Sequence, residues 1–490
     1  MSAARPAGPH IATAGPIDCD ICVVGAGAAG LSVASAAAML GARTVLVERG
    51  AMGGDCLNVG CVPSKALLAA ARMAHAWQES DPFGIRYQPP VVDFPAVMRH
   101  VHGVIDGIAP HDSVARYWAM GVDVLQGTAR FTGRDRLRVA FLAGGAEREV
   151  TAKRFVIATG GRPAVPPIPG LDAVPYLTNE TLFDLAALPS HLVILGGGPI
   201  GLEMAQAFRR LGAAVTVVEA AQALGRDDPE LAAVVLASLR RDGVVLRQGA
   251  AAERVAAGPA GIEVHLSGGG APVTGSHLLV AVGRRPNVED LGLEAAGVQR
   301  SQRGIVVDRR LRTANRRIFA VGDVAGGPQF THVGGYHAGI VIRNALFRIP
   351  AKADHDVMPW VTYTEPELAW VGRSEAAARD RAGRIRILRW PYAENDRARA
   401  ERQTAGLIKV VTDTKGRILG AGVAGAHAGE VVQPWALAVQ RGMKIGAFAG
   451  AVLPYPTFGE VGKRAAGAYY MPKLFSPLTR KMVGLLLHLP

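Results

Sequence analysis

The sequence predicts an α/β fold in which one kind of unit occurs twice before a C-terminal α+β domain. Each unit consists of a strand, a glycine-rich turn, a helix and a second strand. G-x-G-x-x-G turns begin at Gly25 and Gly196, and each follows a short apolar segment; the second strands end in Glu48 and Glu219. From about Val357 the pattern changes to mixed strands and helices. These observations indicate two Rossmann-like domains followed by a different domain.

Length and composition exclude several classes of protein. The 490 residues are enough for three or four domains. The net charge is +13, but only nine of the 54 basic residues are lysine, and the arginines are spread along the chain. Because no nucleic-acid motif accompanies this charge, we expect no nucleic-acid partner. Four cysteines do not form a secreted disulfide framework, and neither a signal peptide nor an apolar run of about 18 residues is present, so we expect a cytoplasmic protein.

The first unit predicts a dinucleotide site. A buried strand is expected over 20–24, a small-residue helix follows to about Leu40, and a second strand over 44–47 ends at Glu48. Glycines in such a turn allow a pyrophosphate to approach the helix N-terminus, and the terminal acid can accept a hydrogen bond from a ribose hydroxyl. The alternative is a structural βαβ unit without a ligand. The glycines concerned are Gly25, Gly27 and Gly30.

A glycine-rich loop with two cysteines runs from Gly53 to Lys65. Cys61 falls at the expected start of a helix, where the helix dipole lowers the pKa of a thiol, so Cys61 should be the more stable thiolate. Cys56, one loop earlier, should be the more exposed of the two. Such a pair can close into a disulfide and reopen when two electrons arrive. The alternative is a buried pair of unreactive cysteines.

Cys19 and Cys22 form a second pair, a C-x-x-C that could suggest redox or metal chemistry. They fall at the entry to the first strand and within it. Strand alternation points positions 19 and 22 to opposite faces. We therefore interpret them as structural and expect no metal site.

The chain between the two units should be helical over 66–118, with a break at Pro89-Pro90, and should form short strands over 121–142 and a strand over 154–158. The second unit then repeats the pattern, with strands over 191–195 and 214–218.

Glu219 bears on which nicotinamide nucleotide the second unit binds. A carboxylate at this position accepts from a free ribose 2′-OH and repels a 2′-phosphate. Arg226 is the first basic residue after it. The sequence therefore favours NADH over NADPH.

The segment from Gly53 to Lys65 closely resembles the signature of the class I flavin-dependent disulfide reductases, the pyridine nucleotide-disulfide oxidoreductase family that includes dihydrolipoamide dehydrogenase and mercuric reductase. Asp55 departs from it, because the family usually has threonine there. The resemblance extends from about Asp18 to about Tyr470. Further segments that resemble family motifs are 127–131, 159–163, 284–287 and 317–323.

The resemblance implies a homodimer in which electrons pass from NADH through FAD to a Cys56–Cys61 disulfide. It also implies that Cys61 contacts the flavin, that Lys65 near the flavin pairs with Glu203, and that Asp323 holds the ribityl chain. The residues expected at FAD are Gly25, Gly27, Gly30, Glu48, Gly54, Lys65, Ala129, Thr159, Gly160 and Asp323. Those expected at NAD are Gly196, Gly198, Gly201, Glu219, Val255 and Gly283.

The same resemblance implies a division into domains. The expected segments are a flexible N-terminus (1–17), the FAD-binding domain (18–165), the NAD-binding domain (166–289), a return to the FAD-binding domain (290–355), the interface domain (356–470) and a tail (471–490). The tail is expected to pack on the dimer, and contact with a membrane surface is the alternative.

Tyr455 is a departure from the dithiol-active relatives, which supply a histidine here from the partner subunit; Glu460 matches the family. Tyrosine, with a pKa near 10, is a poor proton shuttle at neutral pH. Mercuric reductases also have tyrosine here, but they carry a C-terminal cysteine pair, and this chain has no cysteine after Cys61. The acceptor is therefore expected to be a soft metal ion or a disulfide. Dihydrolipoamide dehydrogenase-like activity, a flavin-dependent redox-responsive binding protein and a purely packing role for Tyr455 remain alternatives.

Overall fold

The structure is a computed structural model that describes residues 15–144 and 147–489. Most of the N-terminal segment expected to be flexible therefore lies outside the described residues. The chain divides into two compact units, which are described separately. The first contains the described residues up to Gly196 together with Arg210–Ala214 and Ala252–His355, and the second contains Gly197–Arg209, Val215–Ala251 and the described residues from Asp356 onward.

A parallel sheet forms the centre of the first unit. Its parallel strands lie in the order β3-β2-β1-β5-β17, and β4 runs antiparallel between β3 and β5. Val24 is the register partner of both Val47 and Ile157, so these strands end at one edge of the sheet. The strands are β1 (Ile17–Val24), β2 (Thr44–Glu48), β3 (Val122–Phe131), β4 (Arg136–Phe141), β5 (Arg148–Ile157) and β17 (Ile318–Ala320).

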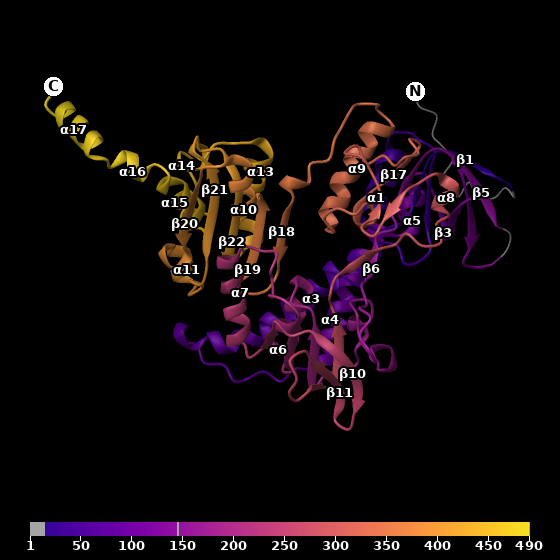
Figure 1. Cartoon of the computed structure of the whole chain (residues 1–490), viewed down its shortest axis with the longest axis horizontal. Helices are drawn as coiled ribbons and strands as arrows, with labels where there is room; N and C mark the ends of the chain where they lie inside the picture. Colours follow the sequence, from indigo (N-terminus) through magenta and orange to yellow (C-terminus); the bar gives the residue numbers. More distant parts are fainter. Residues whose placement is uncertain (1–14, 145–146, 490) are drawn as a thin grey trace. The chain divides into compact units, whose positions relative to one another are not determined.

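Two helices cover one face of this sheet. Helix α1 (Ala28–Met39) lies beside α9 (Thr331–Ala345) (Figure 1). Their small and branched side chains pack against the strands. The small residues of α1 allow this close approach. The other helices of the unit are α2 (Gly54–Asn58), α3 (Cys61–His75), α4 (Phe94–Ile108), α5 (Val114–Ala119) and α8 (Leu293–Ala296).

The prediction that Cys19 and Cys22 face opposite sides of the first strand is wrong. Both side chains are buried in the same hydrophobic cluster, and the hydrogen bond with Cys19, together with burial, raises the pKa of the Cys22 thiol. The cause is a local irregularity at Asp20, because the carbonyl oxygen of Arg43 accepts from the backbone N–H groups of both Asp20 and Ile21. The side-chain alternation shifts by one at this point, although the register of β1 with β5 keeps the same offset from Ile17 to Val24.

The first unit also contains several smaller sheets. Strand β7 (His191–Leu195) pairs in parallel with β13 (His277–Val280). The remaining strands are β6 (Gly161–Pro163) with β14 (Arg284–Pro286), β10 (Ala252–Gly258) with β11 (Gly261–Leu266) and β12 (Val273–Gly275), and β15 (Arg300–Ser301) with β16 (Gly304–Ile305).

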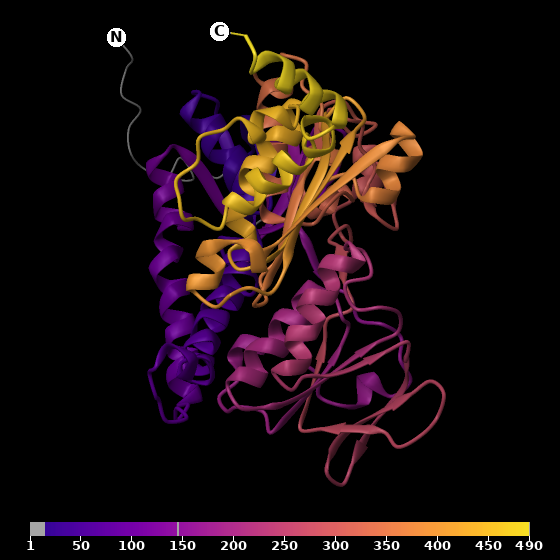
Figure 2. The same ribbon diagram turned by 90° about the vertical axis from the view of Figure 1, so that its left-hand side faces the viewer.

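In the second unit, a five-stranded antiparallel sheet has the order β18-β19-β22-β21-β20. Its strands are β18 (Pro359–Thr362), β19 (Glu367–Gly372), β20 (Ile385–Pro391), β21 (Leu407–Asp413) and β22 (Ile418–Gly425). The helices α13 (Gln433–Arg441) and α15 (Glu460–Ala468) pack on it through a core that includes Trp435 and Ala465. Figure 2 shows the yellow helices of this segment against the orange strands. The expected C-terminal α+β domain is therefore confirmed.

The second unit also holds part of the second glycine-turn region. Its elements there are α6 (Pro199–Arg210, within the unit through Arg209), the parallel strands β8 (Ala214–Glu219) and β9 (Val245–Gln248), and α7 (Pro229–Arg241). The shorter helices of the unit are α10 (Glu375–Ala382), α11 (Asp396–Ala400), α12 (Ala428–Val431) and α14 (Gly446–Ala449).

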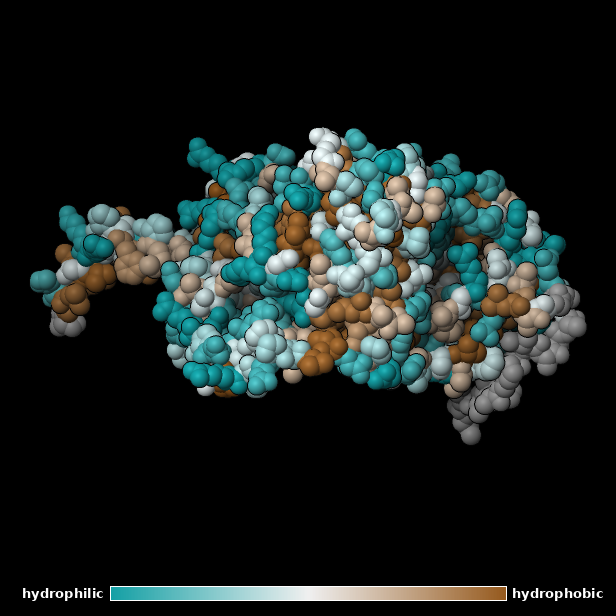
Figure 3. Space-filling model, turned by 90° about the horizontal axis from the view of Figure 1, so that it is seen from below, coloured by the Kyte–Doolittle hydropathy of each residue, from teal (hydrophilic) through white to brown (hydrophobic). Residues whose placement is uncertain are grey.

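The C-terminal segment forms α16 (Met471–Leu474) and α17 (Pro477–Leu486). Leu478, Leu485 and Leu487 are exposed there, and Figure 3 shows brown, hydrophobic side chains along this segment. Within the described part of the chain, no helix combines the length and the apolar character needed to cross a membrane. The expected packing of the tail on the dimer remains a prediction.

Candidate active site

The turn after β1 is shaped for close approach of a ligand. Gly25 has a φ of +106°, and a Cβ at this position would lie 2.4 Å from the carbonyl oxygen of Ala158, so only glycine fits. Helix α1 begins after Gly27 without a side-chain cap and without an acidic residue in its first turn. Its first N–H groups are therefore suited to a pyrophosphate.

The acid at the end of β2 holds this turn in place. The Glu48 carboxylate accepts from the backbone N–H of Ala26 at 2.5 Å and from that of Gly50 at 2.6 Å. Sequence reasoning assigned Glu48 only to a ribose hydroxyl. The structure adds an anchoring role that no local sequence signal indicated.

The second glycine turn has the same two features, a glycine with a positive φ and a carboxylate that accepts hydrogen bonds from the backbone of the turn. In the first unit, Gly196 has a φ of +110°, and a Cβ there would lie 2.4 Å from the carbonyl oxygen of Ala281. In the second unit, the Glu219 carboxylate accepts from the backbone N–H of Gly197 at 2.7 Å and from that of Ala221 at 2.8 Å. The two turns therefore share their local construction as well as their sequence pattern.

The two cysteines of the glycine-rich loop lie on successive helices. Cys61 is the first residue of α3, as expected from the sequence, and Cys56 is the third residue of α2. Cys61 is exposed and Cys56 is half-buried, so the prediction that Cys56 is the more exposed is wrong. The reason is that Cys56 sits within a helical turn, whereas Cys61 lies at an open helix start.

The thiol pair ionises unequally. The hydrogen bond that Cys56 shares with Cys61, together with burial, raises the pKa of the Cys56 thiol well above its usual range. A single thiolate therefore forms more readily on Cys61. The Oγ1 of Thr331, at the start of α9, lies 3.4 Å from the Cys61 sulfur, and sequence reasoning did not identify this neighbour. Lys65 lies one turn further along α3, and its Nζ donates to the Ser64 hydroxyl at 3.3 Å.

The cysteine loop is joined to the first glycine turn. The backbone N–H of Gly53 donates to the carbonyl oxygen of Ala26 at 2.9 Å, and Gly27 and Gly53 form a parallel bridge. A ligand bound along the turn at Gly25 would therefore run toward the loop that carries Cys56. This arrangement is the one that a flavin dinucleotide beside a redox-active cysteine pair requires.

A half-buried guanidinium lies between two acids near this loop. Arg284 forms an ion pair with Asp55, and its Nε donates to the Asp323 carboxylate at 3.3 Å. Its Nη2 also donates to the carbonyl oxygen of Gly161 at 2.9 Å. Burial raises the pKa of Asp323, Arg284 partly offsets this rise, and Asp55 adds to it. The substitution of threonine by Asp55 was the one sequence signal for this cluster.

Most other expected cofactor residues lie in the first unit. The Thr159 hydroxyl donates to the carbonyl oxygen of Asn287 at 2.7 Å, and the Asn287 N–H donates to the carbonyl oxygen of Gly160 at 3.0 Å. Ala129 is buried on β3. Val255 lies on β10, and Gly283 lies directly before β14.

Glu203, Gly198 and Gly201 belong to the second unit, at the start of α6. Glu203 is buried, and its Oε1 accepts from the backbone N–H of Tyr363 at 3.0 Å. Because Lys65 lies in the first unit, its pairing with Glu203 remains a prediction.

Tyr455 lies in the second unit, and its hydroxyl group is hydrogen-bonded. Its OH donates to the Asp396 carboxylate at 2.8 Å, and this hydrogen bond raises the pKa of Tyr455 above its usual value. Tyr455 is 67% exposed, so this polar group is accessible on the surface of the unit. Glu460, the first residue of α15, forms an ion pair with Arg464 at 2.9 Å. Sequence reasoning did not identify Asp396.

Comparison with known families gives two matches. Residues 19–338 match the model described as pyridine nucleotide-disulphide oxidoreductase. Residues 358–466 match the dimerisation domain of the same group. Together the two matches cover nearly all of the described chain.

Curated relatives include mercuric reductases and dihydrolipoyl dehydrogenases. A mercuric reductase from Streptomyces lividans is 39% identical over 92% of this chain and 96% of the relative. A dihydrolipoyl dehydrogenase from Geobacillus stearothermophilus is 33% identical over 92% of this chain and 96% of the relative.

Solved structures show the same similarity. The Cu(II) complex of the HOCl-induced flavoprotein disulfide reductase RclA from Escherichia coli aligns with a TM-score of 0.82 at 30% identity, over 92% of this chain and 99% of that one. LpdA from Mycobacterium tuberculosis aligns with a TM-score of 0.84 at 28% identity, over 92% and 99%.

Proposed function

Because the chain belongs to the pyridine nucleotide-disulphide oxidoreductase family, we propose that it passes two electrons from NADH, through FAD and a Cys56–Cys61 disulfide, to a soft metal ion. The protein is a flavin-dependent oxidoreductase that uses FAD and a pyridine nucleotide. The observation that carries the proposed acceptor is the hydrogen bond from Tyr455 to Asp396.

The residues around the first glycine turn suit FAD. The uncapped start of α1 would receive the pyrophosphate, Glu48 fixes the turn, and Asp323 would hold the ribityl chain. FAD, when bound, accepts a hydride from a nicotinamide and passes the electron pair on. The second glycine turn and Glu219 would hold the NADH that supplies this hydride, with NADH preferred over NADPH.

Cys56 and Cys61 would receive the electron pair. Two electrons and one proton convert their disulfide into one thiol and one thiolate, with cleavage of the S–S bond. The raised pKa of Cys56 supports a thiol on Cys56 and a thiolate on Cys61. Lys65, with Glu203 as its expected partner, would stabilise negative charge beside the flavin.

Organic disulfides and soft metal ions differ in whether their reduction places protons on the acceptor. Reduction of an organic disulfide by NADH takes up one proton and leaves a proton on each product sulfur. Transfer of two electrons from NADH to a divalent soft metal ion leaves the metal atom, NAD⁺ and one proton, with no protonation of an acceptor sulfur. Tyr455 is a poor proton shuttle because its hydroxyl donates to Asp396, which raises its pKa further. A soft metal acceptor avoids this limitation.

Two of the similar proteins support a metal ion as the acceptor. The mercuric reductase from Streptomyces lividans is named for a soft metal, and the RclA structure is a Cu(II) complex. Both align over at least nine-tenths of this chain. Thiolates are the protein ligands that soft metal ions prefer. Cys56 and Cys61 would hold the metal ion as it is reduced.

The dimerisation domain makes the protein a homodimer. We propose further that each active site is shared, with Tyr455 and Glu460 of one subunit facing the cysteine pair of the other. On this proposal, residues 18–165 and 290–355 form the FAD-binding domain, residues 166–289 the NAD-binding domain, and residues 356–470 the interface domain.

A dihydrolipoamide dehydrogenase-like activity is the second candidate, because a relative of that name is 33% identical over almost the whole chain. It requires a proton relay at the place of Tyr455. The two candidates therefore differ in one measurable property, the rate with an organic dithiol.

An anaerobic acceptor comparison tests the proposal. The FAD-bound dimer should oxidise NADH when Hg(II) is added with a low concentration of a small thiol, and much more slowly with oxidised lipoamide. Cys56→Ser and Cys61→Ser should abolish the Hg(II)-dependent reaction, whereas Cys19→Ala, in a buried position away from the loop, should retain it. Fast lipoamide reduction without Hg(II)-dependent NADH oxidation would favour the second candidate.

A further inference from the structure

A pocket of about 550 Å³ lies in the first unit, away from the glycine turn at Gly25. Its residues come from the body of β1 and β5, from the ends of α1 and α9, and from Arg317, which directly precedes β17. The turn at Gly25, by contrast, follows the carboxyl end of β1. The residues that line the pocket are Asp20, Leu40, Gly41, Ala42, Lys153, Arg154, Arg317, Ala345, Leu346, Phe347 and Arg348.

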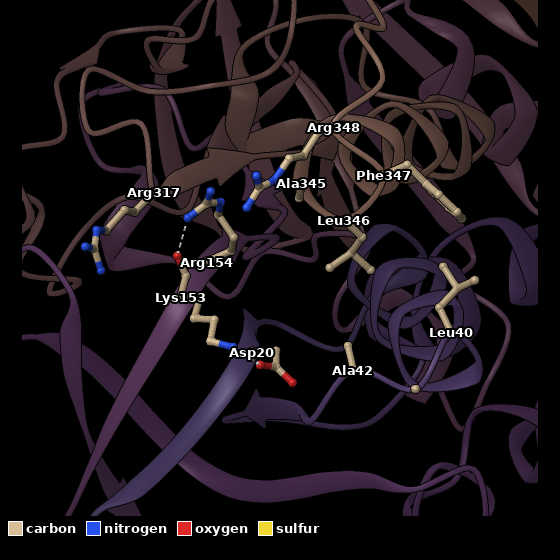
Figure 4. Close-up of a pocket in the computed structure, with 11 residues that line it drawn as sticks. Asp20, Leu40, Ala42, Lys153, Arg154, Arg317, Ala345, Leu346, Phe347 and Arg348 are labelled. Carbon is tan, nitrogen blue, oxygen red and sulfur yellow. Dashed lines mark hydrogen bonds and ion pairs between the residues drawn. The ribbon is translucent and has the colours of Figure 1, made fainter. Parts of the chain in front are cut away.

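The pocket has a charged side and an apolar side. Figure 4 shows the side chains of Arg154, Arg317 and Arg348 on one side, and Leu40 and Phe347 on the other. Leu40 and Phe347 are 51% and 53% exposed, so both apolar surfaces are accessible. A ligand that suits the pocket therefore combines negative charge with an apolar part.

The single carboxylate of the lining does not neutralise the arginines. Asp20 forms an ion pair with the Nζ of Lys153 at 2.8 Å and accepts from the backbone N–H of Arg43, also at 2.8 Å. Among the described residues, none of the three arginines has a carboxylate within ion-pairing distance. Within the described part of the chain, the Arg154 guanidinium donates only to the carbonyl oxygen of Lys153, at 2.7 Å. Burial and the neighbouring Arg317 and Arg348 lower the pKa of Arg154, as expected for like charges held together.

Arg348 also occupies a backbone position that favours glycine. It has a φ of +56° just after the end of α9, where the N–H of Ile349 donates to the carbonyl oxygen of Arg343 at 2.9 Å. A helix commonly ends with glycine in this left-handed conformation, and a residue with a Cβ is strained there. The arginine is therefore not explained by the requirements of the helix end.

We propose that this pocket binds a small phosphorylated molecule with an apolar or aromatic part. Its phosphate lies against the guanidinium groups of Arg154, Arg317 and Arg348, which suit phosphate oxygens in geometry and charge. Its apolar part lies against Leu40 and Phe347. None of the lining residues is among those assigned to FAD or NADH, and the proposal does not depend on the identity of the electron acceptor.

The alternative role for the arginines is to interact with the negative ends of α1 and α9, where cations are favourable. The two roles make opposite predictions for Arg348→Gly. A ligand-binding role predicts weaker anion binding without a lower melting temperature, because glycine relieves the left-handed strain. A purely structural role predicts a lower melting temperature and unchanged anion binding.

Calorimetric titration of the FAD-bound dimer at low ionic strength tests the proposal. Saturating NAD⁺ fills the nucleotide site, and the two probes are inorganic pyrophosphate and 1-naphthyl phosphate. We expect 1-naphthyl phosphate to bind with a Kd below about 1 mM. Arg317→Gln and Arg348→Gly should each raise the Kd of both probes by about tenfold. Phe347→Ala should raise the Kd of 1-naphthyl phosphate by about threefold to tenfold and leave that of pyrophosphate unchanged.

Arg300→Gln is the matched control, because Arg300 is an exposed arginine of the same unit outside the pocket. It should leave both titrations unchanged. The absence of measurable binding for both probes would overturn the proposal. So would binding that Arg317→Gln and Arg348→Gly leave as strong as in the wild type.

Discussion

Asp55, the residue directly before Cys56, forms an ion pair with Arg284, and the same guanidinium donates to Asp323. One half-buried cation is therefore shared between two acids, one of which is the residue expected to hold the flavin ribityl chain. Where relatives of this family have threonine, this chain adds a negative charge that competes for Arg284.

Replacing Asp55 by threonine should release Arg284 from this competition. The guanidinium would then add more net positive charge near the flavin and favour its reduced, anionic form. We expect the midpoint potential of bound FAD to rise by about 10 to 30 mV, the equivalent of roughly 0.5 to 1.4 kcal/mol for two electrons. Anaerobic titration against a reference dye measures this shift.

Asp55→Glu is the control, because it keeps the charge. The midpoint potential of FAD in this variant should stay close to that in the wild type. A potential that is the same in Asp55→Thr as in the wild type would show that the Asp55–Arg284 pair does not influence the flavin.

Two-electron reduction should produce a long-wavelength charge-transfer band from the Cys61 thiolate to FAD. Cys61→Ser should abolish the band while FAD stays bound, because the raised pKa of Cys56 leaves Cys61 as the thiolate. Cys56→Ser should show the band before any reduction, because the Cys61 thiolate then lies beside oxidised FAD with no disulfide to form, and Cys19→Ala serves as a control. Anaerobic absorbance spectroscopy decides the assignment, and a band that survives in Cys61→Ser would remove it.

NADH should be preferred over NADPH in kcat/KM. Glu219→Ala should reduce the preference, and it should also weaken binding of both nucleotides, because the carboxylate anchors Gly197 and Ala221. Loss of one charge-assisted hydrogen bond is worth about 1.5 to 3 kcal/mol, or roughly tenfold to 150-fold in kcat/KM. Steady-state kinetics with both nucleotides, for the wild type, Glu219→Ala and Arg226→Ala, measures the effect. An NADPH preference that disappears in Arg226→Ala would mean that Arg226 overrides Glu219.

His337 should make the first unit sensitive to acid. It is fully buried, it accepts from the Gly322 N–H at 3.2 Å, and its Nε2 lies 2.8 Å from that of His355. Burial, with a smaller contribution from His355, lowers the pKa of His337 to about 4. The unfolded chain, with an ordinary histidine pKa near 6.5, binds this proton first, so stability is complete above pH 6.5 and falls as the pH drops toward 4.

The expected loss between pH 6.5 and pH 4 is at most about 3 kcal/mol from this group. Urea unfolding at both pH values, followed by flavin fluorescence, measures it. His337→Gln should reduce the difference between the two pH values, and the exposed His111→Gln should not. An equal acid-induced loss in wild type and His337→Gln would assign the sensitivity to other groups.

Local features of the fold and site could be predicted from the sequence. The glycine turn at Gly25, the strand that ends at Glu48 and the helix that starts at Cys61 each depend on a few consecutive residues. Their backbone requirements are therefore written in a short stretch of sequence. The repeat of the first turn at Gly196 follows for the same reason.

Features that depend on distant residues could not be predicted. Asp55 and Arg284 are 229 positions apart, and Tyr455 and Asp396 are 59 apart. No periodicity links such pairs. The face of Cys19 was mispredicted because the side-chain alternation shifts at Asp20, where the N–H groups of Asp20 and Ile21 share the carbonyl oxygen of Arg43, directly before β2. The exposure of Cys56 and Cys61 depended on a helical turn that the glycine-rich sequence did not indicate.

The most direct test of the central claim is the rate at which the wild-type dimer reduces NAD⁺ with dihydrolipoamide. Dithiol oxidation needs a group that removes protons from sulfur, and such a group contributes about 10²- to 10⁴-fold. With Tyr455 bound to Asp396, we predict a rate lower by about this factor than in a histidine-containing relative, and a higher rate in Tyr455→His. A wild-type turnover of roughly 10 to 10³ per second would contradict the account, because another group would then relay the proton.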